Sequence, residues 1–333
     1  MTLDKDRFPI AIKPSEKMGN MIHISWMLHN QCNKRCSYCR EFNWNGDSGW
    51  LKYDQIITFV DKVINHSQKD LYHFSFTGGE PVLWPQFDQL CHYLKNKGCE
   101  IGLTTNGSKS ISYWENISDT LNWTCISFHP ESSNEDHIFN VVKVLANKSR
   151  VSVRLMMHKE KEFWDKSVAF GEKLKMADDC SFIFVEYVPL QNDFGLHSRP
   201  MVYENWQREF LEKENHFTVL PTKDVINTHR RDVWDYTTYF NDGTSEFCRP
   251  NDLVANNQVN FKNWICHIGL DLLFINHRGE ILKGACKQGG NIGHIFDPNL
   301  KLPTKPQTCG VNFCPCATDI LIKKHRPGYF DEF

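Results

Sequence analysis

The sequence predicts an α/β fold, a partial (β/α)6 TIM-like barrel over residues 21–190 with a small C-terminal domain built on a β-hairpin. Short strand-like runs alternate with helical patterns through the first part, which predicts crossover units and a parallel sheet. Six units are too few to close an eight-stranded barrel, so we expect an open-sided one. The hairpin pattern follows later, among clustered cysteines.

Apolar periodicity places the individual elements. The predicted strands cover residues 21–29, 71–77, 100–105, 123–129, 150–158 and 181–190. Apolar residues at three- and four-residue spacing predict helices over 51–66, 87–94, 138–145 and 163–174. In the less regular segment 191–242 we expect one helix, over 203–214. The hairpin spans 270–282 and turns at 276–279.

Composition limits the class of protein. The chain of 333 residues is 41% hydrophobic, enough for a sizeable core, and its formal charge of −2 favours no nucleic-acid partner. No apolar run approaches the roughly 20 residues that span a bilayer, and residues 1–20 lack a secretory pattern. We therefore expect a cytoplasmic protein without a membrane partner. Its predicted parts are an N-terminal extension (1–20), the barrel (21–190), a connecting segment (191–245) and the C-terminal domain (246–333).

Thirteen cysteines are the unusual feature of the composition. Their odd number and the lack of an export signal argue against a disulfide framework, and clustered cysteines in a reducing compartment are typical metal ligands. Four stand alone in apolar patterns and are interpreted as buried small hydrophobes: Cys91, Cys99, Cys125 and Cys180. The others fall into two groups, one near each end of the chain.

The first group is Cys32, Cys36 and Cys39, spaced C-x3-C-x2-C directly after the first strand. Three thiolates can bind three irons of a cubane cluster and leave the fourth iron open for a substrate. The alternatives are a chance clustering of core cysteines and a zinc site. A structural zinc site takes four protein ligands, and no fourth lies nearby. The sequence therefore predicts an iron–sulfur cluster.

Other polar and glycine-rich segments follow the ends of neighbouring strands. Gly78-Gly79-Glu80-Pro81 follows the second strand, Thr105-Asn106-Gly107 ends the third, and Ser127 and His129 end the fourth. Because the carboxyl ends of parallel barrel strands meet at one rim, we expect these residues to lie with the cysteine loop.

The cysteine loop, Tyr38 before its third cysteine, the 78–81 motif and the six crossover units together resemble the radical S-adenosylmethionine (radical SAM) superfamily over residues 21–190. The resemblance implies that S-adenosylmethionine chelates the open iron of a 4Fe-4S cluster held by Cys32, Cys36 and Cys39. One electron then gives methionine and a 5′-deoxyadenosyl radical, which takes a hydrogen atom from the substrate. The protein supplies binding, orientation and exclusion of water. The electron comes from a partner protein, an electron donor such as flavodoxin or ferredoxin.

The resemblance also implies contacts to the cofactor. Gly78, Gly79 and Glu80 would face the amino group of its methionine moiety, although an ordinary strand-to-helix turn also fits them. Asn106 would bond ribose or carboxylate, or form an Asx-type turn. Tyr38 would pack against adenine, or be a core aromatic residue.

Two residues on strands four and five complete this set. Ser127 and Arg154 match positions that bind the cofactor carboxylate in relatives with an auxiliary domain. An arginine on a buried strand needs an anionic partner. That partner is either the cofactor carboxylate or an acidic side chain with a structural role. His129, His158 and Glu186 face the same rim and are candidate substrate contacts, or lie one layer behind them.

The second cysteine group resembles the Twitch or SPASM auxiliary domains of radical SAM enzymes. Cys266 and Cys286 flank the hairpin, and Cys309, Cys314 and Cys316 follow it. The resemblance implies one further 4Fe-4S cluster, since the segment has too few cysteines for the two clusters of a full SPASM domain. Five cysteines are available for the four ligand positions of one cluster. Cys248 is a sixth candidate ligand, or a thiol near the active site. A four-cysteine zinc site is the alternative.

Two classes of function follow. The first is a radical SAM oxidoreductase of Twitch type, whose auxiliary cluster accepts an electron so that the net reaction is an oxidation. Its substrate would be a small molecule such as a sugar or aminocyclitol, or a ribosomal peptide; the 20 residues before the first strand are too few for a peptide-binding winged domain. The second class is a non-catalytic iron–sulfur or zinc-binding module.

Overall fold

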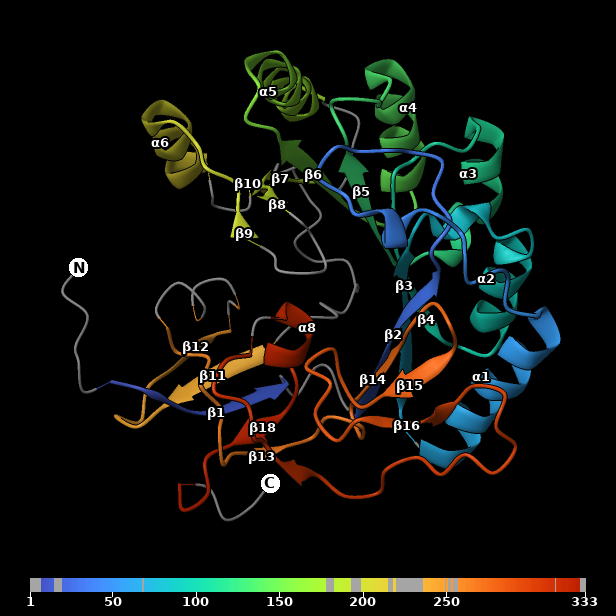
Figure 1. Ribbon diagram of the computed structural model, residues 1–333, viewed down its shortest axis with the longest axis vertical. Coiled ribbons are helices and arrows are strands. Elements are labelled where there is room, and N and C mark those ends of the chain that lie inside the picture. The colour runs from blue at the N-terminus through green and yellow to red at the C-terminus, as the bar shows by residue number, and fades with distance from the viewer. Residues whose placement is uncertain are drawn as a thin grey trace. The chain divides into compact units, whose positions relative to one another are not determined.

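The computed structural model divides the chain into two compact units (Figure 1). Unit 1 comprises Met1–Ser25, Asp54–His73 and His229–Phe333, and unit 2 comprises Trp26–Tyr53 and Phe74–Thr228. The structure describes residues 7–14, 20–67, 69–177, 183–192, 199–214, 218–219, 236–248, 250, 253, 257–314 and 316–329. Cys180 and the first two residues of the sixth predicted strand lie outside these ranges. No helix in the described part is long and apolar enough to cross a membrane.

The six predicted barrel strands are present and lie side by side in chain order. They are β2 (Met21–His29), β3 (Leu71–Gly78), β4 (Glu100–Thr105), β5 (Trp123–Phe128), β6 (Arg150–Met157) and β7 (Ile183–Pro189). The pairs β4–β5, β5–β6 and β6–β7 are parallel, as crossover connections require. The short β10 (Thr218–Val219) pairs antiparallel with β7, and the described sheet stays open. The partial-barrel prediction is thereby confirmed.

Helices cover the outer side of this sheet (Figure 1). They are α2 (Phe87–Asn96), α3 (Ile111–Ile117), α4 (Glu135–Ala146) and α5 (Lys161–Lys175), with α6 (Asn205–Glu214) following β9 and α1 (Tyr53–Ser67) leading into β3. Four of the predicted helices correspond to α1, α2, α4 and α5, and the fifth to α6. Helix α3 was not predicted, because its seven residues bury only Trp114 and Ile117 and show too little periodicity. Ser110 caps its first turn by accepting a hydrogen bond from the Tyr113 N–H.

Unit 1 contains the predicted hairpin, which is confirmed. β14 (Leu272–Ile275) pairs antiparallel with β15 (Glu280–Leu282), and β16 (Asn291–His294) pairs with β15. A second sheet has the order β12-β11-β1-β18-β13-β17. Its strands are β12 (Ser245–Phe247), β11 (Tyr236–Phe240), β1 (Pro9–Pro14), β18 (Lys324–His325), β13 (Ile265–Cys266) and β17 (Gln307–Thr308).

The second sheet joins segments that are far apart in the sequence. β1 comes from the N-terminal extension and pairs on one side with β11 and on the other with β18, near the end of the chain. Its residue Ile12 is fully buried in a core with Phe261 and Trp264. The short elements left are β8 (Gln191–Asn192), which pairs with β9 (Arg199–Pro200), the helix α8 (Ala317–Ile320), and the 3-10 turns η2 (Glu41–Asn43), η3 (Pro81–Leu83) and η4 (Ser118–Thr120).

Candidate active site

The cysteine loop begins three residues after β2 and is tightly folded. The Cys39 N–H donates to the Cys36 carbonyl at 3.0 Å, and the Lys34 N–H donates to Cys32 Sγ at 3.4 Å. Cys36 is 8% exposed, and burial raises the pKa of its thiol to about 11. Burial also raises the pKa values of Cys32 and Cys39. Three thiols that burial keeps protonated ionise readily only beside a compensating cation, which cluster iron supplies.

The glycine motif packs against the chain that enters this loop. A Cβ atom on Gly78, whose φ is +128°, would lie 2.3 Å from the His29 carbonyl oxygen, and one on Gly79 would lie 2.1 Å from that of Gln31. The Gly79 N–H donates to His29 O at 2.9 Å, and the Glu80 N–H donates to Gln31 O at 2.8 Å. The glycines are therefore required by the close approach of two backbone segments. Their contact with the cofactor stays a prediction.

Glu80 connects the ends of β3 and β4. Its side chain is 1% exposed, and its two oxygens accept hydrogen bonds from Thr105 Oγ1 and the Asn106 N–H, both at 2.6 Å. Burial raises the pKa of Glu80 to about 7, while these hydrogen bonds favour the carboxylate. Asn106 Nδ2 donates to Asn33 Oδ1 at 2.9 Å and lies 3.7 Å from Cys32 Sγ. Glu80 thus holds Asn106 beside the first cysteine.

Asn106 also forms the expected Asx-type turn, because its Oδ1 accepts the Ser108 N–H at 3.0 Å. The side-chain carbonyl is used in the turn and the side-chain amide points to the cysteine loop. Its bond to the cofactor stays a prediction.

Replacing Glu80 by alanine is expected to destabilise the protein and loosen the cysteine loop. The change leaves the buried Thr105 hydroxyl and Asn106 N–H without acceptors, at about 1–3 kcal/mol each. We expect a lower melting temperature and a lower iron content after anaerobic reconstitution. The exposed Glu115→Ala variant is the matched control, and Glu80→Gln, which keeps one acceptor oxygen, should be intermediate. Wild-type melting and iron content in Glu80→Ala would contradict this role.

Tyr38 is hydrogen-bonded to one of the predicted rim histidines. Its hydroxyl lies 2.5 Å from His129 Nδ1. Burial raises the pKa of Tyr38 and lowers that of His129 to about 3, so the phenol keeps its proton and the imidazole is neutral. The phenol and the neutral imidazole therefore share one hydrogen bond. This contact fixes the Tyr38 ring within the loop, and its packing on adenine stays a prediction.

Glu131 anchors the same loop and was not predicted. Its Oε2 accepts the Ser37 N–H at 3.0 Å, and its Oε1 accepts the Ser37 hydroxyl at 2.6 Å. His158, which is 7% exposed, places Nε2 3.6 Å from the same Oε1. Glu131 therefore ties the residue after Cys36 to the loop after β5. It stands two positions beyond the predicted end of that strand, so a wider search along the rim would have found it.

Replacing Glu131 by alanine is expected to weaken cluster retention. The loop loses two hydrogen bonds to a charged acceptor, but Ser37 is exposed and water replaces part of them, so the net cost is about 1.5 kcal/mol. We expect the reconstituted variant to lose iron to a chelator roughly tenfold faster than the wild type, with Glu115→Ala unchanged. Equal rates for the wild type and Glu131→Ala would show that the loop does not depend on this anchor.

Ser127, Arg154 and Glu186 form one row across three neighbouring strands. Ser127 pairs with Arg154, and Arg154 with Glu186, in parallel register on β5, β6 and β7. Arg154 Nε donates to Glu186 Oε2 at 2.9 Å. The structure thus brings three predicted site residues together and gives the arginine an acidic partner in the protein. Binding of the cofactor carboxylate by Ser127 and Arg154 stays a prediction.

Comparison with known families agrees with this geometry. The model of the radical SAM superfamily matches residues 26–178, which contain the cysteine loop and the β3 to β6 strand ends. This segment, somewhat less than half of the chain, therefore matches the radical SAM superfamily. That superfamily implies a 4Fe-4S cluster and S-adenosylmethionine, and three buried or half-buried thiols in one short loop fit that cluster.

Individual similarities are more distant. The S-adenosylmethionine-dependent nucleotide dehydratase of Thermoplasmatales archaeon (strain ISO4-H5) is 24% identical over 165 residues, 44% of this chain and 56% of that protein. The AdoMet-dependent heme synthase of Methanosarcina barkeri is 30% identical over 86 residues, 26% of this chain and 24% of that protein. The curated relatives are thus matched over about half of their length or less.

Among solved structures, Streptococcus suis SuiB bound to S-adenosylmethionine has a TM-score of 0.50 at 15% identity, covering 85% of this chain and 65% of SuiB. SuiB bound to its precursor peptide SuiA has the same TM-score at 13% identity, covering 85% and 64% of the two chains. This similarity shows that the two chains share a fold.

The second cysteine group lies in unit 1. Cys266, Cys309 and Cys314 belong to one buried cluster together with Cys248, and Cys286 packs against it. Cys316 is partly exposed, two residues beyond Cys314. Among the described residues of the whole chain, no three His, Cys, Asp or Glu side chains surround a single metal position. A cubane cluster does not need such a position, because each of its thiolate ligands binds a different iron.

Two charged residues that the sequence did not single out stand beside these thiols. Asp319, 1% exposed, accepts the Ala285 N–H at 3.0 Å and the Cys286 N–H at 2.5 Å. Lys324, also 1% exposed, donates to the carbonyls of Asp319 and Ile320 at 2.5 and 2.7 Å. Burial raises the pKa of Cys314 to about 12, and the Lys324 charge opposes that shift. A buried ammonium beside thiols favours their ligand form.

Proposed function

We propose that this chain is a radical SAM oxidoreductase. Cys32, Cys36 and Cys39 would hold three irons of the cluster and leave the fourth for S-adenosylmethionine. Once bound, the two cofactors supply a 5′-deoxyadenosyl radical, which abstracts a substrate hydrogen atom. The observation that carries the proposal is the anchoring of the cysteine loop, by Glu80 through Asn106 and by Glu131 through Ser37.

The protein's own residues would bind and orient the cofactor. We assign Gly78, Gly79 and Glu80 to the side of the amino group, and Asn106 to the ribose or carboxylate. Ser127 and Arg154, which share one row of the sheet, would bind the carboxylate. Tyr38 would pack on adenine. His129, His158 and Glu186 would contact the substrate or support residues that do.

For the C-terminal domain we propose one auxiliary 4Fe-4S cluster of Twitch type. Its ligands would come from Cys266, Cys286, Cys309, Cys314 and Cys316, of which three share a buried cluster and a fourth packs against it. The cluster would accept the electron left on the substrate after hydrogen abstraction, and the net reaction would be an oxidation. An external flavodoxin or ferredoxin would reduce the first cluster. The described cysteines are free thiols, which supports a reducing, cytoplasmic setting.

The substrate we favour is a small molecule such as a sugar or aminocyclitol. Residues 9–14, which precede the barrel, form β1, and because β1 pairs with β11 on one side and β18 on the other, it is not open to a peptide strand. The alternative is a ribosomal peptide, as suggested by SuiB in complex with SuiA.

An assay without substrate tests the proposed reaction. The protein is reconstituted with iron and sulfide under anaerobic conditions, reduced with dithionite and incubated with S-adenosylmethionine. We expect slow release of 5′-deoxyadenosine and methionine. A protein that binds iron and S-adenosylmethionine but releases neither product would be the non-catalytic module instead.

A further inference from the structure

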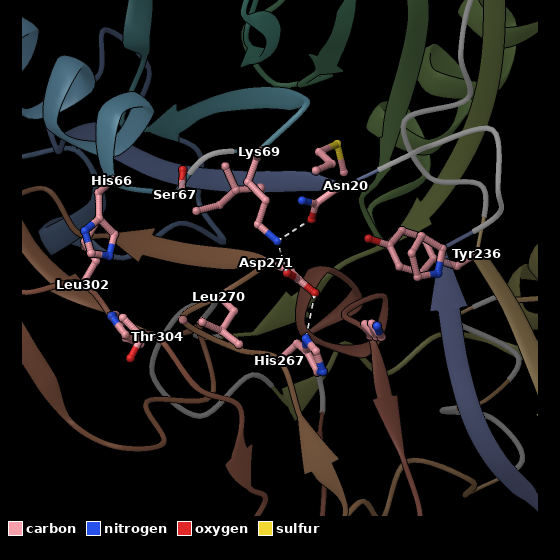
Figure 2. Close-up of a pocket in the computed structure, with 16 residues that line it drawn as sticks. Asn20, His66, Ser67, Lys69, Tyr236, His267, Leu270, Asp271, Leu302 and Thr304 are labelled. Atoms are coloured by element: carbon pink, nitrogen blue, oxygen red, sulfur yellow. Dashed lines mark hydrogen bonds and ion pairs between the residues drawn. The ribbon is translucent and has the colours of Figure 1, made fainter. Parts of the chain in front are cut away.

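Unit 1 contains a cavity of about 620 Å³ that the proposed radical chemistry does not use (Figure 2). It is lined by Met21 and Ile22 at the start of β2, whereas the cysteine loop follows the other end of that strand. Much of the remaining wall is apolar and comes from Leu270, Leu302 and Pro303. A cavity of this size, apolar with a few polar groups, is typical of a small-molecule site.

A half-buried ion-pair network forms one wall of the cavity. Lys69 Nζ lies 2.8 Å from Asp271 Oδ1 and donates to Asn20 Oδ1 at 2.7 Å, and His267 Nδ1 lies 3.3 Å from Asp271 Oδ2 (Figure 2). The side chains of Lys69 and Asp271 are only 15% and 13% exposed. Both oxygens of the Asp271 carboxylate therefore contact side chains of the protein. A cationic ligand would gain little from binding to Asp271.

Tyr236 adds an unused polar group. Its side chain is 4% exposed, and its hydroxyl makes no hydrogen bond with any residue that the structure describes. In Figure 2 the hydroxyl points toward Lys69 and Asp271. Burial, and then the charge of Asp271, raise the pKa of Tyr236, so the phenol stays protonated. A buried O–H directed into a cavity is a donor for a ligand oxygen.

Positive charge gathers on the neighbouring strands. Lys323 lines the cavity, and the antiparallel register that pairs Ile12 with Lys324 brings it beside Lys13. Burial, and then the charge of Lys323, lower the pKa of Lys13, so the two cations are close enough to repel each other. Tyr236 pairs with Pro14, on the other side of β1. Lys323 therefore brings a cationic side chain to the cavity wall, and an anion there would accept the Tyr236 hydrogen bond.

We propose that this cavity binds a small anionic ligand, a carboxylate or a phosphate monoester on an apolar body. Its charged group lies between Lys323 and the Tyr236 hydroxyl, and its apolar body packs on Leu270, Leu302 and Pro303. The C-terminal end of α1, with His66 and Ser67, lines the cavity as well and favours no anion, so the ligand's charge faces away from it. The site stands independently of the proposed radical reaction.

Isothermal titration calorimetry on the full chain tests the site, with excess S-adenosylmethionine present so that the cofactor site is filled. The probes are 2-naphthyl phosphate, 2-naphthoate and the neutral 2-naphthol at pH 7.5. We expect one anion per chain to bind and the neutral probe to bind at least about tenfold more weakly. Binding of the phosphate alone or the carboxylate alone identifies the natural oxyanion, and binding of both establishes the shared chemistry.

Variants locate the bound anion. Lys323→Met is expected to weaken binding by about tenfold or more, and Tyr236→Phe, which removes one oxygen and keeps the ring, by about threefold to tenfold. Lys305→Met, an exposed lysine outside the cavity, should bind as the wild type does. The proposal is overturned if neither anion binds, if 2-naphthol binds as tightly as the anions, or if Lys323→Met is unchanged. Should Lys323→Met not fold, Tyr236→Phe decides in the same way.

Discussion

Replacing Cys32, Cys36 and Cys39 together by alanine is expected to abolish cleavage of S-adenosylmethionine. Without the three thiolates there is no protein ligand for the cluster, and no iron with an open position for the cofactor. The reconstituted variant should lose about four irons per chain, and release of 5′-deoxyadenosine should fall to the background level. Iron analysis and product chromatography on the same sample measure both effects.

The matched control removes the same number of thiols elsewhere in unit 2. Cys91, Cys99 and Cys125 are buried at 0%, 6% and 0% exposure and lie outside the loop. Their triple alanine variant should keep its iron and its cleavage activity, with only the moderate loss of stability that small core truncations cause. A loop variant that still binds its full iron and still cleaves the cofactor would refute the proposed function.

Replacing Cys266 and Cys286 by alanine is expected to separate the two proposed clusters. The variant should bind about four irons per chain where the wild type binds about eight. It should still release 5′-deoxyadenosine without substrate, because the loop of unit 2 is unchanged, but it should no longer oxidise substrate. Unit 1 should also melt at a lower temperature, since a bound cluster stabilises only the folded form.

Zinc analysis decides between the two interpretations of these cysteines. About four irons and one zinc per wild-type chain, with the zinc lost in Cys266→Ala/Cys286→Ala, would replace the auxiliary cluster by a structural zinc site. The Cys91→Ala/Cys99→Ala variant removes two buried thiols from unit 2 and should leave the metal content of both sites unchanged. Glu131→Ala adds a second comparison, because it should affect only the iron of the loop.

Much of the barrel was predictable because its signals are local. Apolar residues at period 3.6 define α4, whose Ile138, Val142 and Leu145 are at most 2% exposed, and the cysteine spacing needs only eight consecutive residues. The row of Ser127, Arg154 and Glu186 was also within reach, since parallel strands align their ends. The hairpin β14–β15 followed from its turn residues.

Residues that act through contacts distant in sequence were not predictable in this way. Glu131 lies 94 positions from Ser37, and Asp319 lies 33 from Cys286, so no local spacing links either pair. The motif at Gly78 and Gly79 was recognised from the sequence, but the reason for its glycines was not. A Cβ atom at either position would come within 2.3 Å of the backbone of His29 or Gln31, and this close approach depends on tertiary packing. The same holds for β1, which joins the sheet of unit 1 through β11 and β18.

The sequence by itself determined the six strands, the helices with a clear apolar face, the three-thiol loop and the resemblance to the radical SAM superfamily. Each depends on residues within one turn, one strand or one short loop, where covalent geometry fixes which side chains share a face. Only the tertiary structure decided which acids hold the cysteine loops, which partner neutralises Arg154, and that Lys69, Tyr236 and Lys323 line one cavity. Those contacts arise when the chain folds back on itself and buries polar groups, which must then find partners wherever the packing places them.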